Sequence, residues 1–447
     1  MGAALSWSVR TVDRALDGET VYRELLAAEP VAFWLDGSLT DRVARRVSVL
    51  GTGSDVLVRD AVDGDVFAEL QALLASRAAQ PPPVLDGYFS GGYVGYFGYE
   101  LKSLTGGAAT HQASTPDALW IWADRFVVID HDRDLTLLVT VGLGDEWLDR
   151  AVRAAADWSM TGVVRPAIAE LDVEAHLELD RPAYLAAIAR CMTALEAGET
   201  YEVCLTNRVR LPAVPDPFGF FCWQRATNPA PYAAFLRYGD LAVASSSPER
   251  FLTVDADGWA ECRPIKGTAP RDLDPFQDQL AAKALAEDEK TRAENLMIVD
   301  LIRNDLGRVS VPGSVQVPQL MQVESYRTVH QLVTTVRGRL RPEVSAVDAV
   351  RACFPPGSMT GAPKIRTMEL LDELEPSARG VYSGALGYLT VDGRADLSVV
   401  IRTAVLTPDE TVIGAGGAIV LDSEAVAEYD EMVLKATAAL GLGKVGA

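Results

Sequence analysis

The chain has 447 residues, which exceeds the usual size of one small domain and supplies ample material for a large core. Hydrophobic residues make up 49% and charged residues 23% of the sequence, as is typical of a globular protein with no membrane-spanning run. The net charge of −21 argues against nucleic acid or an anionic membrane as a partner. Five scattered cysteines without a Cys-x-x-Cys pair argue against a zinc site or a disulfide scaffold, and they suit a reducing, cytoplasmic location.

The first third of the chain is predicted to mix helices and strands. Helical spacing covers 21–30, which ends at Pro30, and 65–78, which stops before three consecutive prolines. Apolar runs and glycine-aromatic alternation predict the strands, which we place at 31–38, in a pair within 87–100, and in a further pair at 119–130 and 135–143.

The rest of the chain is predicted to contain more strands, broken by a few long helices. The helices are expected at 181–199, about 276–303 and about 423–440. The strands are expected at 201–211, 233–247, 250–255, 328–340, 384–393, 397–407 and 411–420. Runs of strands with few helices between them predict an α+β fold with antiparallel sheet rather than a βαβ repeat.

A polar, irregular segment predicts where the chain divides. We assign an N-terminal region to residues 1–165, a linker to 166–180 and a larger C-terminal region to 181–447. The motifs that carry chemistry lie mainly in the C-terminal region. We therefore expect that region to hold the active site.

The residues around Lys266 place a lysine in a constrained turn. The stretch 263–271 reads RPIKGTAPR, with Pro264 ahead of the lysine and Gly267 directly after it. Both residues restrict the backbone, so we expect the Lys266 side chain to point in a fixed direction. An amine held in a partly dry pocket loses proton affinity and becomes a nucleophile near neutral pH. The alternative is an ordinary loop lysine without a chemical role.

Glutamates on two predicted helices indicate a metal site. Glu294 shares an apolar face of the helix at 276–303, where a carboxylate needs a cation, a metal or several donors. Glu428, Glu431 and Lys435 share one face of the closing helix. One carboxylate from each helix would suit Mg²⁺, which keeps waters and completes its shell with an anionic substrate. The alternative for Glu431 and Lys435 is a surface ion pair worth about 0.3–0.5 kcal/mol.

Three further features interrupt apolar strands. Arg402 stands within LSVVIRTAVLT, where a guanidinium either binds a substrate carboxylate or forms an internal salt bridge. A glycine-rich turn at 414–417 would expose backbone N–H groups that are able to cradle a carboxylate. His330 lies in an apolar strand, where a histidine is by default a satisfied core residue.

Ten motifs occur in one order between residues 90 and 435, and AFWLDGS (32–38) extends the set. They are SGGYVGYFGYE (90–100), GETYEVCLTNR (198–208), NPAPY (228–232), SSSPERF (245–251), RPIKGTAPR (263–271), AENLMIVDLIRNDLGRV (293–309), FPPGSMTGAPK (354–364), IRT (401–403), GAGGAIV (414–420) and AEYDEMVLK (427–435). Together they resemble the chorismate-utilising enzymes, which comprise the large subunits of anthranilate and aminodeoxychorismate synthases and the isochorismate and salicylate synthases. The resemblance implies large antiparallel sheets that form a β-sandwich core flanked by helices.

Two positions suggest a branch of that family. Lys266 resembles component I of the aminodeoxychorismate synthases, because anthranilate synthases and the water-using members usually carry Ala there. The water-using members place a lysine base where this chain has Glu202. Without that lysine, the isochorismate and salicylate alternatives lose their activator of water. Some aminodeoxychorismate synthases have Gln in place of Glu202, and we assign Glu202 no catalytic role.

The resemblance implies a covalent mechanism. Lys266 would attack the ring carbon of chorismate that bears no leaving group, and Glu249 would protonate the departing 4-hydroxyl as general acid. Ammonia would then add at ring carbon four and displace the lysine, giving 4-amino-4-deoxychorismate. His330 matches a position that lines the family's pocket, so the resemblance overrides its interpretation as a core histidine.

The resemblance also implies how the substrate is held. Mg²⁺ bound by Glu294 and Glu431, with Glu428 close by, would bind the ring carboxylate. The remaining residues would hold the other carboxylate or line the pocket, and they are Arg402, Tyr382, Gly416, Gly417, Lys435, Thr268 and Thr360.

The ammonia implies a partner. The sequence shows no Gly-x-Cys-x-Gly nucleophile turn with a His-x-Glu partner, so we expect a separate glutamine amidotransferase subunit in a heterodimer. A later lyase would complete 4-aminobenzoate, the folate precursor. The rival functions are anthranilate synthase component I and a non-catalytic regulator that binds chorismate or tryptophan; Lys266 argues against the first and the intact acidic residues against the second.

Overall fold

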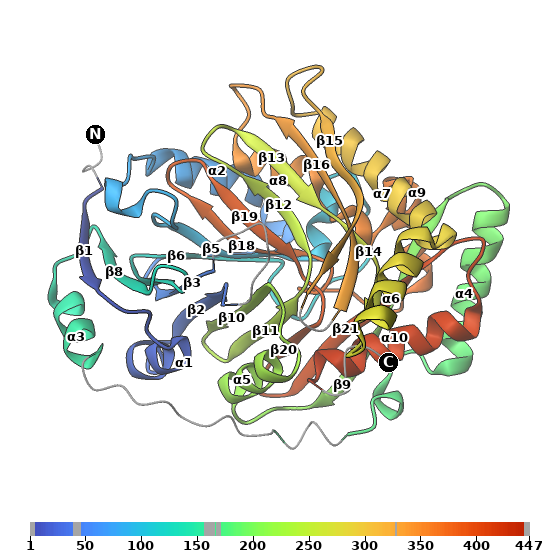
Figure 1. The fold of residues 1–447 in the computed structure, drawn as a ribbon, viewed down its shortest axis with the longest axis horizontal. Helices are drawn as coiled ribbons and strands as arrows, with labels where there is room; N and C mark the ends of the chain where they lie inside the picture. The colour runs from blue at the N-terminus through green and yellow to red at the C-terminus, as the bar shows by residue number, and fades with distance from the viewer. Residues whose placement is uncertain (1–4, 39–45, 156–165, 167–170, 327–328, 442–447) are drawn as a thin grey trace.

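The computed structural model describes residues 5–38, 46–155, 166, 171–326 and 329–441. In these residues the strands form two antiparallel sheets, one of eleven strands and one of ten. Helices cover the outside of the sheets, and Figure 1 shows α4, α5 and α10 on the side of β9, β11 and β21. The expected α+β fold with a sandwich of large antiparallel sheets is confirmed. None of the described helices combines the length and apolarity needed to cross a membrane.

The eleven-stranded sheet alternates segments from distant parts of the chain. In spatial order its strands are β1 (Trp7–Val12), β8 (Leu135–Val141), β7 (Arg125–Asp130), β3 (Val47–Thr52), β2 (Val31–Asp36), β10 (Tyr232–Tyr238), β11 (Leu241–Ser247), β20 (Thr403–Leu406), β21 (Glu410–Ile419), β9 (Glu202–Pro212) and β17 (Gly361–Ala362).

The ten-stranded sheet is assembled in the same way. In spatial order its strands are β14 (Ile265–Pro270), β16 (Val329–Arg339), β13 (Trp259–Arg263), β12 (Arg250–Val254), β19 (Ala395–Val399), β18 (Ala385–Thr390), β5 (Gly92–Phe97), β6 (Ala118–Trp122) and β4 (Val56–Arg59), while β15 (Gln316–Ser325) also pairs with β16.

The helices follow the predicted pattern with local differences. They are α1 (Gly18–Val21), α2 (Val66–Ser76), α3 (Glu146–Ala155), α4 (Arg181–Glu196), α5 (Pro217–Thr227), α6 (Pro275–Glu287), α7 (Glu289–Gly307), α8 (Ala346–Cys353), α9 (Lys364–Leu374) and α10 (Ala425–Ala439). The segment predicted as a pair of strands at 87–100 contains the single strand β5, followed by the short 3₁₀ helix Tyr99–Leu104.

Two hydrophobic cores lie on opposite faces of the eleven-stranded sheet. Strand β2 illustrates the arrangement, because Phe33 belongs to one core and its neighbour Trp34 to the other. The first core contains residues of both sheets and of α2, α7 and α8. The second packs α4, α5 and α10 against the outer face. Burial on both faces explains why VAFWL reads as a continuous apolar run instead of an alternating one.

Two predicted elements are each divided in the structure. The helix expected at 276–303 is two helices, because the chain leaves helical geometry at Asp288, whose side chain accepts a hydrogen bond from the Thr291 N–H and caps α7. The strand expected at 397–407 is also two strands. β19 belongs to the ten-stranded sheet and β20 to the eleven-stranded sheet. The chain crosses between the sheets at Arg402, whose φ of 50° lies in the left-handed region.

Both sheets take strands from either side of the predicted boundary. β2 pairs with β10 in one sheet, and β5 pairs with β18 in the other. Within the predicted linker at 166–180, residues 167–170 lie outside the described residues, and the described part includes the short 3₁₀ helix Glu174–His176. The N-terminal and C-terminal regions therefore share their sheets and cores within the described chain.

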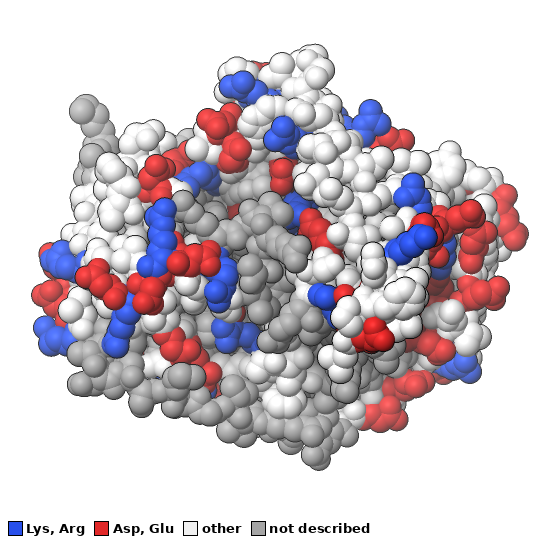
Figure 2. Space-filling view, in the orientation of Figure 1, with Lys and Arg blue, Asp and Glu red and all other residues white. Residues whose placement is uncertain are grey.

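Charges of both signs are distributed over the surface. Figure 2 shows acidic and basic side chains interspersed on the face that it presents, without a large area of one sign.

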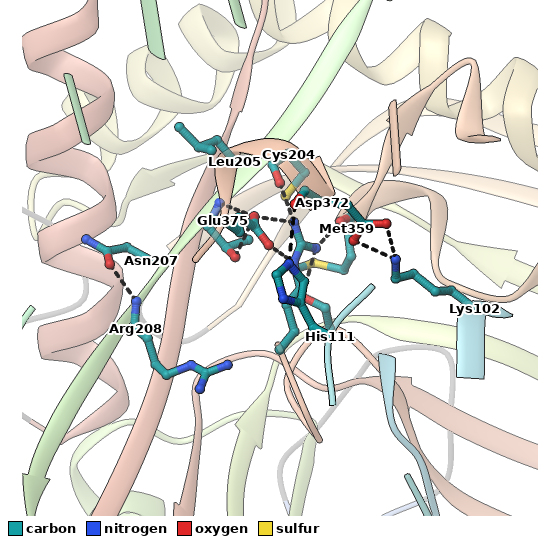
Figure 3. A network of polar contacts seen from close by, with 12 residues as sticks. Lys102, His111, Cys204, Leu205, Asn207, Arg208, Met359, Asp372 and Glu375 are labelled. Carbon is teal, nitrogen blue, oxygen red and sulfur yellow. Dashed lines mark hydrogen bonds and ion pairs between the residues drawn. The ribbon is translucent and has the colours of Figure 1, made fainter. Parts of the chain in front are cut away.

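A buried ion pair joins the segments that surround the middle of the molecule. Arg379 donates to both carboxylate oxygens of Glu375, at 2.7 and 2.8 Å, and to the backbone oxygens of Cys204 and Met359. Glu375 also accepts hydrogen bonds from the backbone and hydroxyl of Thr206. Figure 3 shows Glu375, Cys204 and Met359 converging at this point. The network therefore ties β9 to the end of α9 and to the loop before α9.

Replacing Arg379 with Ala should strongly destabilise the protein. The change leaves the Glu375 carboxylate buried without its cation, and the side chains of this pair are only 3% and 8% exposed. We expect the free energy of unfolding to fall by about 3–5 kcal/mol in urea denaturation. The control is Arg303→Ala, because the ion pair of Arg303 with Asp300 is largely exposed. That change should cost less than about 1 kcal/mol. Equal losses in the two variants would contradict a structural role for the buried network.

Candidate active site

The candidate site lies where the ends of the two sheets meet. Lys266 lies on β14 at the end of the ten-stranded sheet, and Glu202 lies on β9 near the end of the eleven-stranded sheet. The Lys266 Nζ and Glu202 Oε1 atoms are 2.5 Å apart, and both residues are buried. The ion pair thus connects the two sheets, and the helices α7 and α10 bring further charged groups to the same place.

A sharp bend in β14 directs Lys266 into the site. The register between β14 and β16 shifts between Ile265 and Thr268, and Gly267 adopts a φ of +79°. A Cβ atom at Gly267 would lie 2.5 Å from the Thr291 Cγ2 atom of α7 and 2.9 Å from a methyl carbon of Leu285. Glycine is therefore required both by the backbone conformation and by the close approach of the helices. This confirms that the Lys266 side chain is held in a fixed direction.

Lys266 does not have the lowered proton affinity that we expected. Burial favours the neutral amine, but the carboxylates of Glu202 and Glu294 outweigh it and raise the pKa of Lys266 above its ordinary value. The prediction of a lowered pKa was wrong because it considered the dry pocket without its acidic neighbours. In the free protein Lys266 is an ammonium, and it must lose a proton before it can act as a nucleophile.

Glu249 has the environment of an acid that keeps its proton near neutral pH. Burial raises its pKa to about 7, although the Ser358 hydroxyl donates a hydrogen bond to it at 2.8 Å and Lys266 is close enough to oppose the shift. A small cavity of about 20 Å³ adjoins Glu249 and Ser358. Its size suits about one water molecule. Glu249 and Lys266 thus combine a carboxyl group that titrates near neutral pH and an ammonium in one site.

The acidic residues of α7 and α10 face one another across Lys290. The Lys290 ammonium lies 2.7 Å from Glu428 and 3.9 Å from Glu294. Burial raises the pKa of Glu294 to about 7, and the nearby charge of Glu428 contributes to the shift. Glu431 forms a half-exposed ion pair with Lys435 at 2.8 Å, which lowers the pKa of Glu431. The contact between Glu431 and Lys435 therefore agrees with the alternative of a surface ion pair.

The donor chemistry at this place fits Mg²⁺. In the described chain no three Asp, Glu, His or Cys side chains converge closely enough to hold a metal by themselves. Mg²⁺ takes only one or two protein carboxylates and fills its shell with waters and an anionic substrate. The buried Glu428 and the largely buried Glu294 already share one cationic group, the Lys290 ammonium. Both carboxylates are thus suited to a cation.

Arg402 is a partly buried arginine without a carboxylate partner in the described part of the chain. Its backbone accepts hydrogen bonds from Ser246 and Gln224, but no described Asp or Glu side chain forms an ion pair with it. Burial lowers its pKa. This excludes an internal salt bridge within the described residues and leaves the carboxylate-binding alternative. The unusual φ at Arg402 is consistent with a position constrained by function.

The glycines expected in a turn lie inside strand β21. Residues 410–419 of β21 pair continuously with β9, whereas β20 pairs only with residues 411–413 on the other side. Lys435 donates to the Gly416 carbonyl at 3.0 Å, and a Cβ at Gly417 would lie 3.2 Å from a Glu428 oxygen. The prediction of a turn was wrong, since the glycines allow close packing within a strand. On the side away from β9, the backbone of residues 414–419 has no strand partner among the described residues.

The remaining predicted residues differ in their surroundings. His330 is buried, and its ring nitrogens contact Ser325 and Asp278 at 2.8 and 2.9 Å. Thr360 is buried beside β9, whereas Thr268 is exposed. No direct hydrogen bond or ion pair joins the described His330 to Lys266 or Glu249. The contacts of His330 agree with a satisfied buried histidine, and its catalytic role stays a prediction.

Tyr382 lies close to the glycine strand. It is buried, and the position of a Cβ at Gly414 would overlap its ring. Burial raises the pKa of its hydroxyl well above the ordinary value. The tyrosine therefore stays neutral and is able to donate a hydrogen bond.

Sequence reasoning gave Glu202 no role in this site and did not identify Ser358 or Lys290. Glu202 holds Lys266, Ser358 holds Glu249, and Lys290 holds Glu428. A signal existed for Glu202, because a carboxylate in the buried strand YEVCLT requires a cation. The pattern was unable to identify the cation, since Lys266 lies 64 residues further along the chain.

Comparison with known proteins gives a consistent result. The family described as chorismate binding enzymes matches residues 37–441. An aminodeoxychorismate synthase of Streptomyces pristinaespiralis is 44% identical over 97% of this chain and 64% of its own length. The chain thus spans less than two thirds of that relative. An aminodeoxychorismate synthase component 1 of Salmonella typhimurium is 37% identical over 91% of this chain and 87% of its own length.

A solved structure shows the same fold. Anthranilate synthase component I of Streptococcus pneumoniae superposes with a TM-score of 0.74 at 28% sequence identity. The match covers 95% of this chain and 97% of that protein. The sequence match over most of the chain and the shared architecture agree with the motifs between residues 90 and 435. The chain belongs to the family of chorismate binding enzymes.

Proposed function

We propose that the chain converts chorismate and ammonia to 4-amino-4-deoxychorismate, as the synthase component of an aminodeoxychorismate synthase. The observation that carries this proposal is the buried Lys266, directed by the bend at Gly267 and placed beside the protonated Glu249. The names of the two synthase relatives support the same reaction. A nucleophile and an acid in one site suit displacement of a hydroxyl from a ring.

The chemical step uses Lys266 and Glu249 in separate roles. The Lys266 amine forms a bond to the ring carbon that bears no leaving group, the double bond shifts, and the bond to the 4-hydroxyl breaks. Glu249 supplies a proton to that hydroxyl, which departs as water. Ammonia then bonds to ring carbon four, the double bond shifts back, and the bond to Lys266 breaks. A carboxyl with a pKa of about 7 still carries the required proton in about half of the molecules at neutral pH.

The carboxylates of chorismate would be held at two places. Arg402, with no described carboxylate partner, would bind one carboxylate together with the Tyr382 hydroxyl and the backbone at Gly416 and Gly417. Lys435 would add positive charge nearby. Glu294, Glu428 and Glu431 would hold Mg²⁺ for the ring carboxylate. When bound, Mg²⁺ would neutralise that carboxylate and draw electron density toward it.

The proposed reaction consumes ammonia, so it requires a partner that produces ammonia. We propose that a glutamine amidotransferase supplies it, and the name component 1 of the Salmonella relative is consistent with a synthase that works beside another subunit. A later lyase would remove pyruvate to give 4-aminobenzoate for folate synthesis. The described cysteines are all free and buried, which agrees with a reaction in a reducing cytoplasm.

The rival proposal is anthranilate synthesis, which the similarity to the Streptococcus pneumoniae protein keeps open. The two activities give different products from the same substrate. Purified protein with chorismate, Mg²⁺ and ammonium salt should form aminodeoxychorismate, identified by mass spectrometry and by conversion to 4-aminobenzoate with an added lyase. Formation of fluorescent anthranilate and pyruvate would instead establish anthranilate synthesis as the activity.

Replacing Lys266 with Ala should abolish amination or divert it to another product. The variant lacks the amine that forms the covalent bond, so we expect aminodeoxychorismate formation to fall by at least about 100-fold. The control is Lys283→Ala, because Lys283 lies on the surface of α6 in an exposed pair with Glu287. Undiminished amination by the Lys266 variant would remove the covalent step.

The rate of chorismate conversion should fall as the pH rises through about 7. The pKa of Glu249 is raised from its ordinary value to about 7, so its protonated form is present below this pH and is lost above it. Assays would keep free ammonia constant and Mg²⁺ saturating, because the pKa of Glu294 is also about 7. Glu249→Gln should lower the rate and remove this limb of the profile. If the rate of the Glu249→Gln variant still falls above about pH 7, a group other than Glu249 causes the fall.

Replacing Glu294 with Gln should weaken the response to Mg²⁺. Removing one carboxylate should raise the Mg²⁺ concentration for half-maximal activity by at least about tenfold, with matching weaker binding in calorimetry with chorismate present. Asp300→Asn provides a control on the same helix, since Asp300 is exposed and pairs with Arg303. An unchanged Mg²⁺ titration would move the metal site elsewhere.

A further inference from the structure

The Lys266–Glu202 pair presents a chemical problem for the proposed reaction, on which this inference rests. An ammonium has no lone pair, so Lys266 must release a proton before its nitrogen can bond to carbon. The group in direct contact with the ammonium is Glu202, whose Oε1 lies 2.5 Å from the Lys266 Nζ. Of the other carboxyls near Lys266, Glu249 carries the proton for the hydroxyl and Glu294 belongs to the proposed metal site.

Among the described residues, Glu202 has one charged partner, which is Lys266. Glu202 is completely buried, and its second carboxylate oxygen, Oε2, has no hydrogen-bond partner among the described residues. In the described residues Lys266 is the only cation that contacts it. If Lys266 became neutral alone, a buried carboxylate would remain without compensation, which is strongly unfavourable. Transfer of the proton to Glu202 removes both charges together and avoids this cost.

The backbone around Glu202 holds the carboxylate in place. Glu202 pairs with Ala362 of β17, and the Thr200 hydroxyl donates to the Glu202 carbonyl oxygen at 3.0 Å. A Cβ at Gly361 would lie 2.0 Å from that oxygen, so the strands approach as closely as glycine allows. Such fixed packing keeps the carboxylate at contact distance from Lys266.

We propose that Glu202 positions the Lys266 side chain and accepts its proton when chorismate binds, then returns the proton when the lysine is displaced. The step is balanced. Lys266 ammonium and Glu202 carboxylate become amine and carboxylic acid. The amine then bonds to the ring and becomes a secondary ammonium, while Glu249 loses its proton to the departing hydroxyl. The summed charge of the three groups stays at zero through the attack.

The test measures formation of the covalent adduct without ammonia. Full-length protein, Mg²⁺ and chorismate are mixed, and intact-protein and peptide mass spectrometry follow the adduct at Lys266. Glu202→Gln keeps an oxygen near the amine but cannot accept the proton. We expect its adduct to form about 100-fold more slowly at neutral pH, with chorismate binding changed much less. Glu202→Asp, which keeps the carboxylate on a shorter side chain, should restore part of the rate.

The pH profile separates proton transfer from a structural effect. The groups that face Lys266 are Glu202 and Cys204 of β9, Glu294 of α7, Glu431 of α10 and Glu249. The ratio of wild-type to Glu202→Gln rates should shrink toward alkaline pH, because solvent then takes the Lys266 proton. A ratio that stays constant, or an Asp variant no faster than the Gln variant, would overturn the proposal. Glu199→Gln is the control, since Glu199 pairs with Arg366 at the surface.

The same experiment distinguishes this inference from the proposed function. Absence of an adduct in the wild-type protein would remove the covalent lysine itself. A wild-type adduct together with an equally fast Glu202→Gln variant would remove only the role of Glu202. If Glu202→Gln does not fold, as judged by circular dichroism, the Asp variant alone decides. An adduct rate below that of the wild type, recovering toward alkaline pH, supports the proposal, whereas a wild-type rate and pH profile in Glu202→Asp overturns it.

Discussion

The contact between Lys266 and Glu202 is the constraint on which the arrangement of the site depends. It joins β14 of one sheet to β9 of the other, at a place where both sheets end. Two opposite charges removed from water hold each other strongly, because neither has an alternative partner of comparable strength. The helices α7 and α10 then add their carboxylates around a pair that is already fixed.

The site maintains charges in states that solvent would not favour. Glu249 and Glu294 carry raised pKa values because burial penalises their charged forms, whereas neighbouring carboxylates keep Lys266 protonated. Arg402 is partly buried and has no counter-ion among the described residues. Ionisable groups in such surroundings are typical of sites where a bound ligand of complementary charge supplies the missing partner. The proposed substrate, with two carboxylates and a hydroxyl leaving group, would supply what these residues lack.

A second buried network holds together the strands and helices around this site. Arg379 and Glu375 tie β9 to α9, and the backbone N–H groups of Arg379 and Gly380 also donate to Glu100. Glu100 comes from the N-terminal third of the chain. This arrangement explains how strands from both regions position one active site. The shared sheets make the same point, since β5 pairs directly with β18.

Local sequence patterns indicated most of the secondary structure, the directed side chain of Lys266 and the family. Periodicity located most helices, as at α2 and α4, because burial of one face leaves its period in the sequence, whereas strands buried on both faces, such as β2, were found from continuous apolar runs. Glycine and proline next to Lys266 indicated a directed side chain, and the ordered motifs indicated the family. These features depend on residues that are close in the chain. The break at Asp288 was missed because a capped boundary between two adjacent helices preserves nearly the same apolar pattern.

Only the tertiary structure decided the state of the functional groups. The partner of Lys266 lies 64 residues away on a strand of another sheet, and no local pattern specifies that pairing. The crossing of the chain at Arg402 likewise depends on how the two sheets pack. A pKa depends on the charges and burial around a group in space, so the sequence identified the lysine but the folded structure determined that it is protonated.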